Sequence, residues 1–137
     1  KPQQLPALLR MVERRPGVPV VIDHGGKPAI VDRDWEPWAS DIAELARHPH
    51  VTCKLSGLAT EAGSTWTAQT LARYVDHLLA CFGSKRLLWG SDWPVVDLAG
   101  GYDRWARATE ELLAKLPDAD RSAILGDNAR RFYGLEV

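Results

Sequence analysis

The sequence contains no apolar run of 18 residues, so it predicts no membrane-spanning helix. It also has little net charge: 17 Lys and Arg residues against 18 Asp and Glu residues give a formal charge of -1. That balance excludes the strongly basic surface of a nucleic-acid-binding domain or of a protein held on anionic lipid. Hydrophobic residues make up 45% and charged residues 26% of the 137 positions, which is typical of a globular domain.

The sequence has only two cysteines and lacks the glycine motifs of nucleotide-binding folds. Cys53 and Cys81 both lie in apolar segments, without the CxxC or Cys/His spacing of a zinc finger. We therefore expect two reduced core thiols and a cytoplasmic protein. The segment 25–28 (GGKP) lacks the first glycine and the Ser/Thr of a phosphate loop, and no GxGxxG follows a predicted strand. These absences argue against a nucleotide-binding fold.

What the sequence does contain is an alternation of helix-like and strand-like segments. Helices are predicted where apolar residues recur at helical spacing, over 5–14, 38–46, 67–82, 102–116 and 120–133, the last interrupted near Gly126. Short apolar segments typical of buried strands lie at 18–23, 50–56 and 86–91. This alternation predicts βαβ units, and hence an α/β fold with parallel strands flanked by helices.

The residues that follow the three strand segments are the ones most suited to chemistry. A parallel sheet gathers such residues at one edge, where the carboxyl ends of its strands meet. His24 follows the first segment, Ser56 the second and Asp92 the third. We therefore expect an imidazole and a carboxylate to meet around a shared reactant. No chemistry is assigned to the histidines at helix or strand-entry positions, which are His48, His50 and His77.

Asp92 and His24 are the candidate catalytic residues, and each has a structural alternative. At the mouth of the sheet the Asp92 carboxylate would be partly desolvated, and it could take a proton from water or bind a metal. The alternative is an aspartate that serves a turn or a helix cap. His24 could bind a metal, polarise a carbonyl or shuttle a proton, or it could be satisfied by hydrogen bonds within its turn.

Lys54, Ser56 and two tryptophans are weighed as substrate contacts. Lys54 lies on the polar face of its strand, which would point inward in a closed barrel, where it would need a substrate or carboxylate partner. A pair with a structural aspartate, or a side chain that reaches solvent, fits the sequence equally well. Ser56 has no His-Asp system beside it, so a nucleophilic serine is not expected. Trp93 and Trp35 could stack on a ring of the substrate or pack in the core.

Three segments, in this order and spacing, resemble the C-terminal part of the amidohydrolase-2 family, in particular its branch of sugar-lactone and pyrone-dicarboxylate lactonases. They are VIDHGGKP at 21–28, CKLSGL at 53–58 and LWGSDWPV at 88–95. The closing segment GDNARRFY at 126–133 resembles the last helix of the family. The family fold is a (β/α)8 TIM barrel. The resemblance implies that residues 1–137 form a single partial domain that contains strands six to eight.

The resemblance also implies roles for the residues. Asp92 matches the aspartate that ends strand eight and acts as general base on the hydrolytic water, and His24 matches the histidine that ends strand six. Lys54, Ser56 and Trp93 would contact the substrate, a lactone or a related carboxylate. Zinc held by His24 and Asp92 would instead indicate a zinc-dependent amidohydrolase or decarboxylase, and the sequence favours neither this nor metal-independent hydrolysis.

Length is the largest departure from the family. A TIM barrel needs about 200 residues or more, and the paired histidines that the family carries on strand one have no counterpart here. We therefore expect a fragment that is inactive alone and whose exposed sheet edges let copies associate. A different class stays open, a non-catalytic α/β module that binds a partner through its sheet edge.

Overall fold

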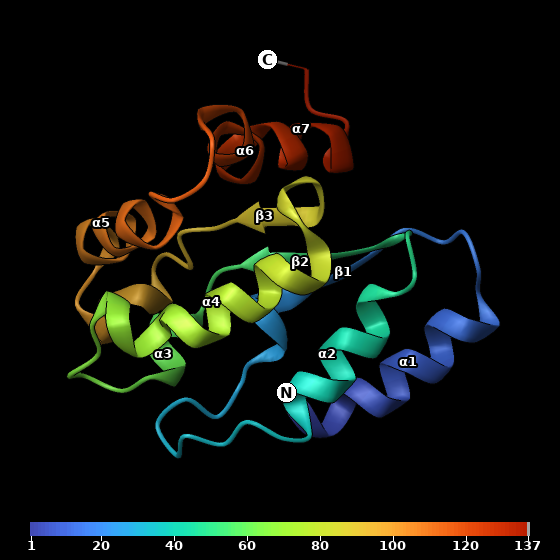
Figure 1. Ribbon diagram of the computed structural model, residues 1–137, viewed down its shortest axis with the longest axis horizontal. Helices are drawn as coiled ribbons and strands as arrows, with labels where there is room; N and C mark the ends of the chain where they lie inside the picture. The colour runs from blue at the N-terminus through green and yellow to red at the C-terminus, as the bar shows by residue number, and fades with distance from the viewer. Residues whose placement is uncertain (137) are drawn as a thin grey trace.

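Three parallel strands form one sheet in the computed structural model, which describes residues 1–136 (Figure 1). The strands are β1 (Val20–Ile22), β2 (Val51–Leu55) and β3 (Leu87–Trp89), and β2 lies between the other two. Both strand pairs are parallel, with Val20 beside Val51 at the start of the first pair. The predicted α/β fold with a parallel sheet is therefore confirmed.

Each strand is shorter than the sequence predicted, because its flanking residues leave the ladder. Asp23 was expected in the first strand, but it begins a tight 3-10 turn, η2 (Asp23–Gly26), directly after β1. Arg86 was expected in the third strand, but it ends another 3-10 turn, η3 (Ser84–Arg86), just before β3. The turn after β1 therefore brings Asp23 to the carboxyl edge of the sheet together with His24.

The helices connect and cover the strands. Their bounds are α1 (Leu5–Arg14), α2 (Trp38–Ala46), α3 (Leu58–Glu61), α4 (Ala68–Phe82), α5 (Tyr102–Leu113), α6 (Asp118–Ser122) and α7 (Asn128–Tyr133). Three helices differ from the prediction. The last helical region begins at Asp118, two residues before its predicted start. The helix expected over 102–116 ends at Leu113, and α3 was not predicted, because four residues are too few to show a helical period.

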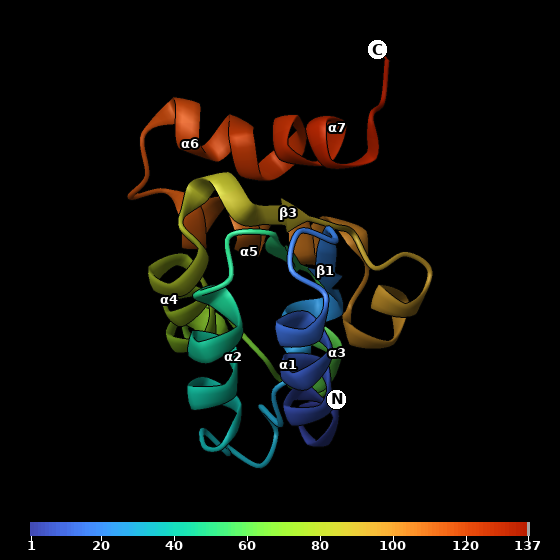
Figure 2. The same cartoon turned by 90° about the vertical axis from the view of Figure 1, so that its right-hand side faces the viewer.

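The last helical region contains the predicted interruption near Gly126. It takes the form of a π-helical turn, η5 (Ala123–Asp127), which joins α6 to α7. Both ribbon views place α6 and α7 beyond β3, at the opposite end of the molecule from α1 and α2 (Figures 1 and 2). The C-terminal helices therefore cover the β3 side of the sheet.

Helix α4 shows why its sequence begins and ends a helix where it does. The side chain of Thr67 accepts a hydrogen bond from the backbone N–H of Thr70, and the two residues form a reciprocal capping box. Gly83 ends the helix with φ of 64°, a conformation that glycine adopts at low cost. Between these ends, Leu71, Val75 and other apolar residues at helical spacing are buried in the core.

Strand β2 has the two-residue period that its sequence predicted. Val51, Cys53 and Leu55 are buried on one face, while Thr52 and Lys54 are half-buried on the other. Both cysteines of the chain are free thiols, and burial raises the pKa of the Cys53 thiol, which makes it unreactive. One face of β2 thus belongs to the core, and the other carries Lys54 toward the edge where His24 lies.

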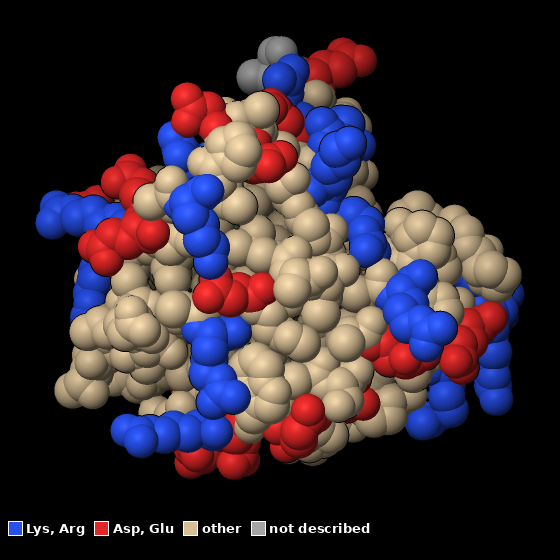
Figure 3. Space-filling model, in the orientation of Figure 1, with Lys and Arg blue, Asp and Glu red and all other residues tan. Residues whose placement is uncertain are grey.

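The surface carries mixed charge. On the face drawn in Figure 3, basic and acidic side chains are interspersed, in keeping with the balanced composition. Among residues 1–136, no helix combines the length and the apolarity that crossing a bilayer requires.

Candidate active site

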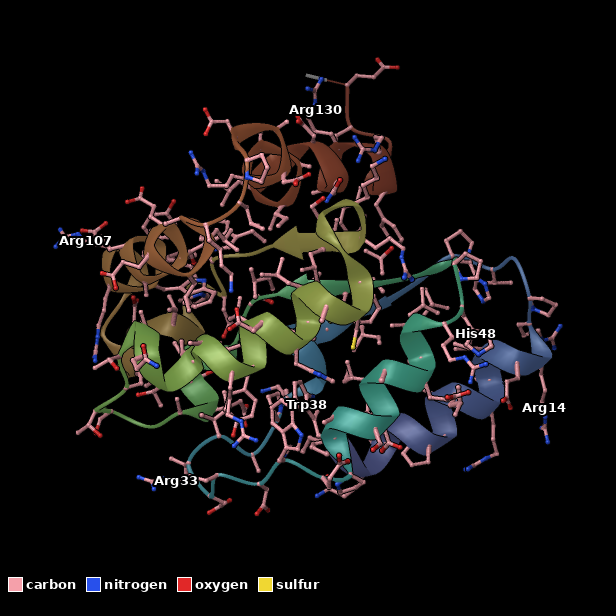
Figure 4. The ribbon with its side chains drawn as sticks, viewed as in Figure 1. Arg14, Arg33, Trp38, His48, Arg107 and Arg130 are labelled. Carbon is pink, nitrogen blue, oxygen red and sulfur yellow. The ribbon has the colours of Figure 1, made fainter. Side chains whose placement is uncertain are left out.

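The turn after β1 aims His24 into the site. His24 has φ of 50° and Gly25 has φ of 58°, so the chain turns back on itself immediately after the strand. Trp38 points from α2 toward this turn (Figure 4), and its Nε1 donates a hydrogen bond to the carbonyl of Gly25 at 2.8 Å. A Cβ atom at Gly25 would lie 3.0 Å from Leu58, so the turn is packed tightly against the core.

The imidazole of His24 contacts a side chain from each of the three strand ends. Its Nδ1 lies 2.9 Å from Oγ of Ser56, which follows β2. Its Nε2 lies 3.1 Å from Oδ2 of Asp23, beside β1, and 3.7 Å from Oδ1 of Asp92, beyond β3. The ring is 22% exposed and the Asp92 side chain 11%. The prediction that an imidazole and a carboxylate meet at the carboxyl edge of the sheet is therefore confirmed.

The Asp92 carbonyl and the Ser91 hydroxyl, rather than the Asp92 carboxylate, accept the hydrogen bonds that close the turn after β3. The backbone N–H of Val96 donates to the Asp92 carbonyl at 2.9 Å, and the N–H of Trp93 donates to Oγ of Ser91 at 3.3 Å. Asp92 has φ of 58°, and its carboxylate faces His24. This arrangement favours the chemical interpretation of Asp92 over the turn-capping one.

Lys54 is paired with a carboxylate that the sequence analysis did not single out. Its Nζ lies 3.1 Å from Oδ1 of Asp23, whose other oxygen faces His24. Partial burial of the Lys54 ammonium acts to lower its pKa, but the hydrogen bond and the charge of Asp23 oppose this and leave the pKa above its ordinary value. Tyr133 of α7 also acts to raise the pKa of Lys54.

Asp23 therefore joins Lys54 to His24. The signal that could have found it was its place next to His24 in the motif VIDHGGKP. Tyr133, which the sequence analysis treated only as part of a helix, could not have been found in this way, because its approach to Lys54 depends on where α7 packs.

Ser56 lies beneath His24 and is 2% exposed. A Cβ at Gly57 would lie 2.7 Å from the Cβ, Cγ and Nδ1 atoms of His24, and one at Gly90 would lie 3.2 Å from the Cβ of Ser56. The ring and the hydroxyl thus fit into space that two glycines leave open. This placement favours a role for Ser56 through His24 over direct contact with a substrate.

The two candidate tryptophans lie in different environments. Trp93 follows Asp92 directly and is 69% exposed, so it is accessible to a ligand at the site. Trp35 packs against Trp38, Tyr74 and His77, with ring centroids 5.0 to 5.6 Å apart, which is the core alternative weighed for it. His77 also lies 2.9 Å from the carbonyl of Ala39, so this histidine is used within the core.

Metal binding can be tested against the geometry of the site. Zinc holds nitrogen and oxygen ligands at about 2.0–2.2 Å, so two ligand atoms of a tetrahedral site lie about 3.3–3.5 Å apart. Nε2 of His24 and Oδ1 of Asp92, at 3.7 Å, come close to that spacing. Among residues 1–136, however, no group of three or more His, Cys, Asp or Glu side chains could hold a metal. The two side chains fit as part of a ligand set that the described residues do not complete.

Comparisons with known proteins match nearly the whole chain. A family model described as "Amidohydrolase" matches residues 1–135. An L-fucono-1,5-lactonase of Burkholderia ambifaria is 44% identical over 140 residues, which are 98% of this chain and 48% of that protein.

Solved structures agree with these matches. A crystal structure of an amidohydrolase from Burkholderia multivorans with bound Zn superposes with a TM-score of 0.91 at 39% identity, over 98% of this chain and 50% of that one. A putative 2-pyrone-4,6-dicarboxylic acid hydrolase from Pseudomonas putida gives 0.78 at 27% identity, over 98% and 49% of the two chains. The chain thus spans about half the length of the relatives it matches.

Proposed function

Because this chain belongs to the amidohydrolase family, we propose that it carries strands six to eight of a (β/α)8 barrel that opens a lactone by hydrolysis. Asp92 is the general base of the proposed reaction, and His24 polarises the lactone carbonyl. The interpretation as a non-catalytic binding module is not favoured, because the relatives are named as lactonases and hydrolases.

One observation carries the proposal, the approach of His24 and Asp92 at the carboxyl edge of the sheet. The 3.7 Å between Nε2 and Oδ1 is too long for a direct hydrogen bond. A water molecule or a substrate oxygen in front of the pair can contact both atoms. With its side chain 11% exposed, the Asp92 carboxylate is largely shielded from solvent, so a water molecule held in front of it meets few competing waters.

In the proposed reaction Asp92 takes a proton from water as the water oxygen attacks the lactone carbonyl carbon. The carbonyl oxygen becomes an oxyanion, which a hydrogen bond from His24 stabilises. When the intermediate collapses, the ring C–O bond breaks and the alkoxide that leaves takes the proton back from Asp92. The product is an open-chain hydroxy acid, and the carboxylate is restored for the next cycle.

The charges of the site support a neutral, hydroxyl-bearing lactone as the substrate class. Asp23 and Asp92 bring two negative charges and Lys54 one positive charge, which Asp23 already compensates at 3.1 Å. A dicarboxylate substrate would meet net repulsion from this part of the site. Sugar hydroxyls could instead donate to Asp23 and accept from Lys54, and the exposed ring of Trp93 could pack on the apolar face of a sugar.

A zinc-dependent reaction is the second candidate, favoured by the spacing of His24 Nε2 and Asp92 Oδ1. These two side chains would supply two of the ligands, and the others would come from outside the described residues. Bound zinc would polarise the carbonyl and acidify water. Metal analysis of the purified full-length protein, with activity measured before and after chelation, separates the two candidates. Activity that survives complete removal of metal would exclude the second.

The variant Asp92→Asn tests the proposed function in the full-length protein. The amide keeps the shape of the side chain but accepts a proton poorly, so we expect kcat for lactone hydrolysis to fall by about 10²- to 10⁴-fold with little change in melting temperature. Asp97→Asn is the matched control, because Asp97 is exposed in η4 (Val95–Ala99), the 3-10 helix that follows Asp92. Turnover by Asp92→Asn at the wild-type rate would contradict the proposal.

A further inference from the structure

We propose that Ser56 is a positioning residue that holds the His24 ring at Nδ1 and leaves the imidazole N–H on Nε2, facing Asp23 and Asp92. The inference deepens the proposed function and rests on it for the expected effect on turnover. The position of the proton on His24 can be measured whether or not the substrate class is right.

The first step is geometric. Ser56 Oγ lies 2.9 Å from His24 Nδ1, a normal hydrogen-bond distance between two side chains 32 residues apart. Ser56 is 2% exposed, so its hydroxyl is shielded from solvent behind the ring. Gly57 and Gly90 leave the space that this pair occupies, since a Cβ at either position would lie within 3.2 Å of His24 or Ser56. The contact is thus held by the packing of two strand ends.

The second step concerns the direction of the hydrogen bonds. Ionised carboxylates only accept hydrogen bonds, whereas a serine hydroxyl can donate or accept. Nε2 lies 3.1 Å from Oδ2 of Asp23, so a neutral ring gains a hydrogen bond there only when Nε2 carries the proton. Nδ1 is then an acceptor, and Ser56 donates to it. In the opposite tautomer, the lone pair of Nε2 would face both carboxylates and the bond to Asp23 would be lost.

The third step links this tautomer to the proposed reaction. With the proton on Nε2, His24 presents a donor on the edge that faces Asp92, where the oxyanion would form. Removing the Ser56 hydroxyl leaves Nδ1 without its donor and frees the ring to rotate. Loss of orientation at a reacting group lowers rates by about 100-fold for a displacement near 1 Å. Ser56 therefore acts on the reaction through His24.

The test uses nitrogen-15 NMR of the histidine rings in the full-length protein, with the His24 signals assigned by their loss in His24→Gln. We expect Nε2 to be protonated and Nδ1 to show the shift of a hydrogen-bonded acceptor. In Ser56→Ala the Nδ1 signal should move toward that of a free acceptor, and kcat should fall by about 10- to 100-fold while KM changes less than about threefold.

Thr109→Val is the matched control, because Thr109 of α5 is also 2% exposed and its hydroxyl contacts none of the site residues: it accepts from Nε1 of Trp89 in β3 and donates to the carbonyl of Trp105. It should lower the melting temperature and leave the His24 signals unchanged. A proton on Nδ1 in the wild type would overturn the inference, as would a raised KM at unchanged kcat in Ser56→Ala. If Ser56→Ala does not fold, the wild-type spectrum alone decides. Failure of the wild type to hydrolyse any lactone would refute the proposed function and leave the spectra to test Ser56.

Discussion

Single residues of the site adopt backbone conformations that side chains normally avoid. His24 and Asp92, with φ of 50° and 58°, are two of the non-glycine residues in the left-handed region. Each such residue lowers the stability of the fold by about 1–3 kcal/mol, and the conformation persists only where the surrounding structure holds it. Here the conformation turns both side chains toward one another at the edge of the sheet. Lys27 and Arg33 share this conformation, so it orients His24 and Asp92 but does not by itself mark them as catalytic.

Gly57 is the residue whose substitution should disturb His24 most directly. Its φ is 65°, and an added Cβ would lie 2.7 Å from three atoms of the His24 side chain. Gly57→Ala should therefore lower the free energy of unfolding by about 2–4 kcal/mol and reduce lactone hydrolysis as well. Urea denaturation and steady-state kinetics of the full-length protein measure the two effects.

Gly134→Ala isolates the contact from the backbone strain. Gly134 is also in the left-handed region, with φ of 64° and ψ of 37°, but a Cβ there would meet nothing within 4 Å. It should cost about 1 kcal/mol of stability and leave the activity unchanged. Equal losses of activity in the two variants would show that Gly57 does not act through His24.

At the scale of elements, α7 is tied to the start of β3. Along a strand, the N–H and C=O groups of successive residues point alternately to the two neighbouring sides. The backbone N–H of Gly90 donates to the carbonyl of Leu55 in β2, so the N–H and C=O groups of Leu87 point away from β2. Asn128, at the start of α7 and 3% exposed, donates from Nδ2 to the carbonyls of Leu87 at 2.8 Å and Ser84 at 2.7 Å. Asn128 thus holds α7 against the turn before β3 and the first residue of the strand.

Asn128→Ala should destabilise the protein by about 2–4 kcal/mol, because two carbonyls lose their donor in a buried setting. Asp127→Ala, one residue earlier and half-exposed, removes only a surface carboxylate and should change stability by about 0.5 kcal/mol or less. Urea denaturation of both variants makes the comparison. If the two variants are equally stable, the hydrogen bonds of Asn128 to Ser84 and Leu87 do not stabilise the fold.

Elements with a local signal were predictable, and those set by distant partners were not. The capping residues and apolar stripe of α4 lie within its own sequence, so its position was predicted closely. Arg86 received no role from its sequence, yet its guanidinium donates to the carbonyls of Ala46, His48 and Val51 at 2.9 to 3.1 Å. It joins the end of α2 to the start of β2, an arrangement that depends on how the elements pack.

At the scale of the whole molecule, a sheet of three strands does not close. The backbone N–H of Val20 donates to the carbonyl of His50, which precedes β2. Because successive residues of a strand point their N–H and C=O groups to opposite sides, those of Val21 face away from β2. Within residues 1–136, no strand pairs with this outer edge of β1. A TIM barrel surrounds its site with eight strands, and we propose that this edge pairs with a further strand in the complete barrel.

A polypeptide limited to these 137 residues should therefore associate through the open edge and should not hydrolyse lactones, because the loops and histidines of the other strands are absent. Sedimentation velocity and a lactone-hydrolysis assay measure the two properties. A monodisperse monomer of 15.2 kDa that melts cooperatively would contradict the first expectation, and turnover by it would contradict the second.

The amino-acid sequence by itself determined the parallel α/β class, the family, and the placement of His24 and Asp92 at strand ends. These follow from apolar periods and motifs that lie within short stretches of chain. Tertiary structure alone decided that Asp23 joins Lys54 to His24, that Ser56 lies behind the ring, and that Trp35 packs against the core. The contacts of Lys54 with Asp23, of Ser56 with His24 and of Tyr74 with Trp35 join side chains that are tens of residues apart, and the packing of strands and helices sets which atoms meet.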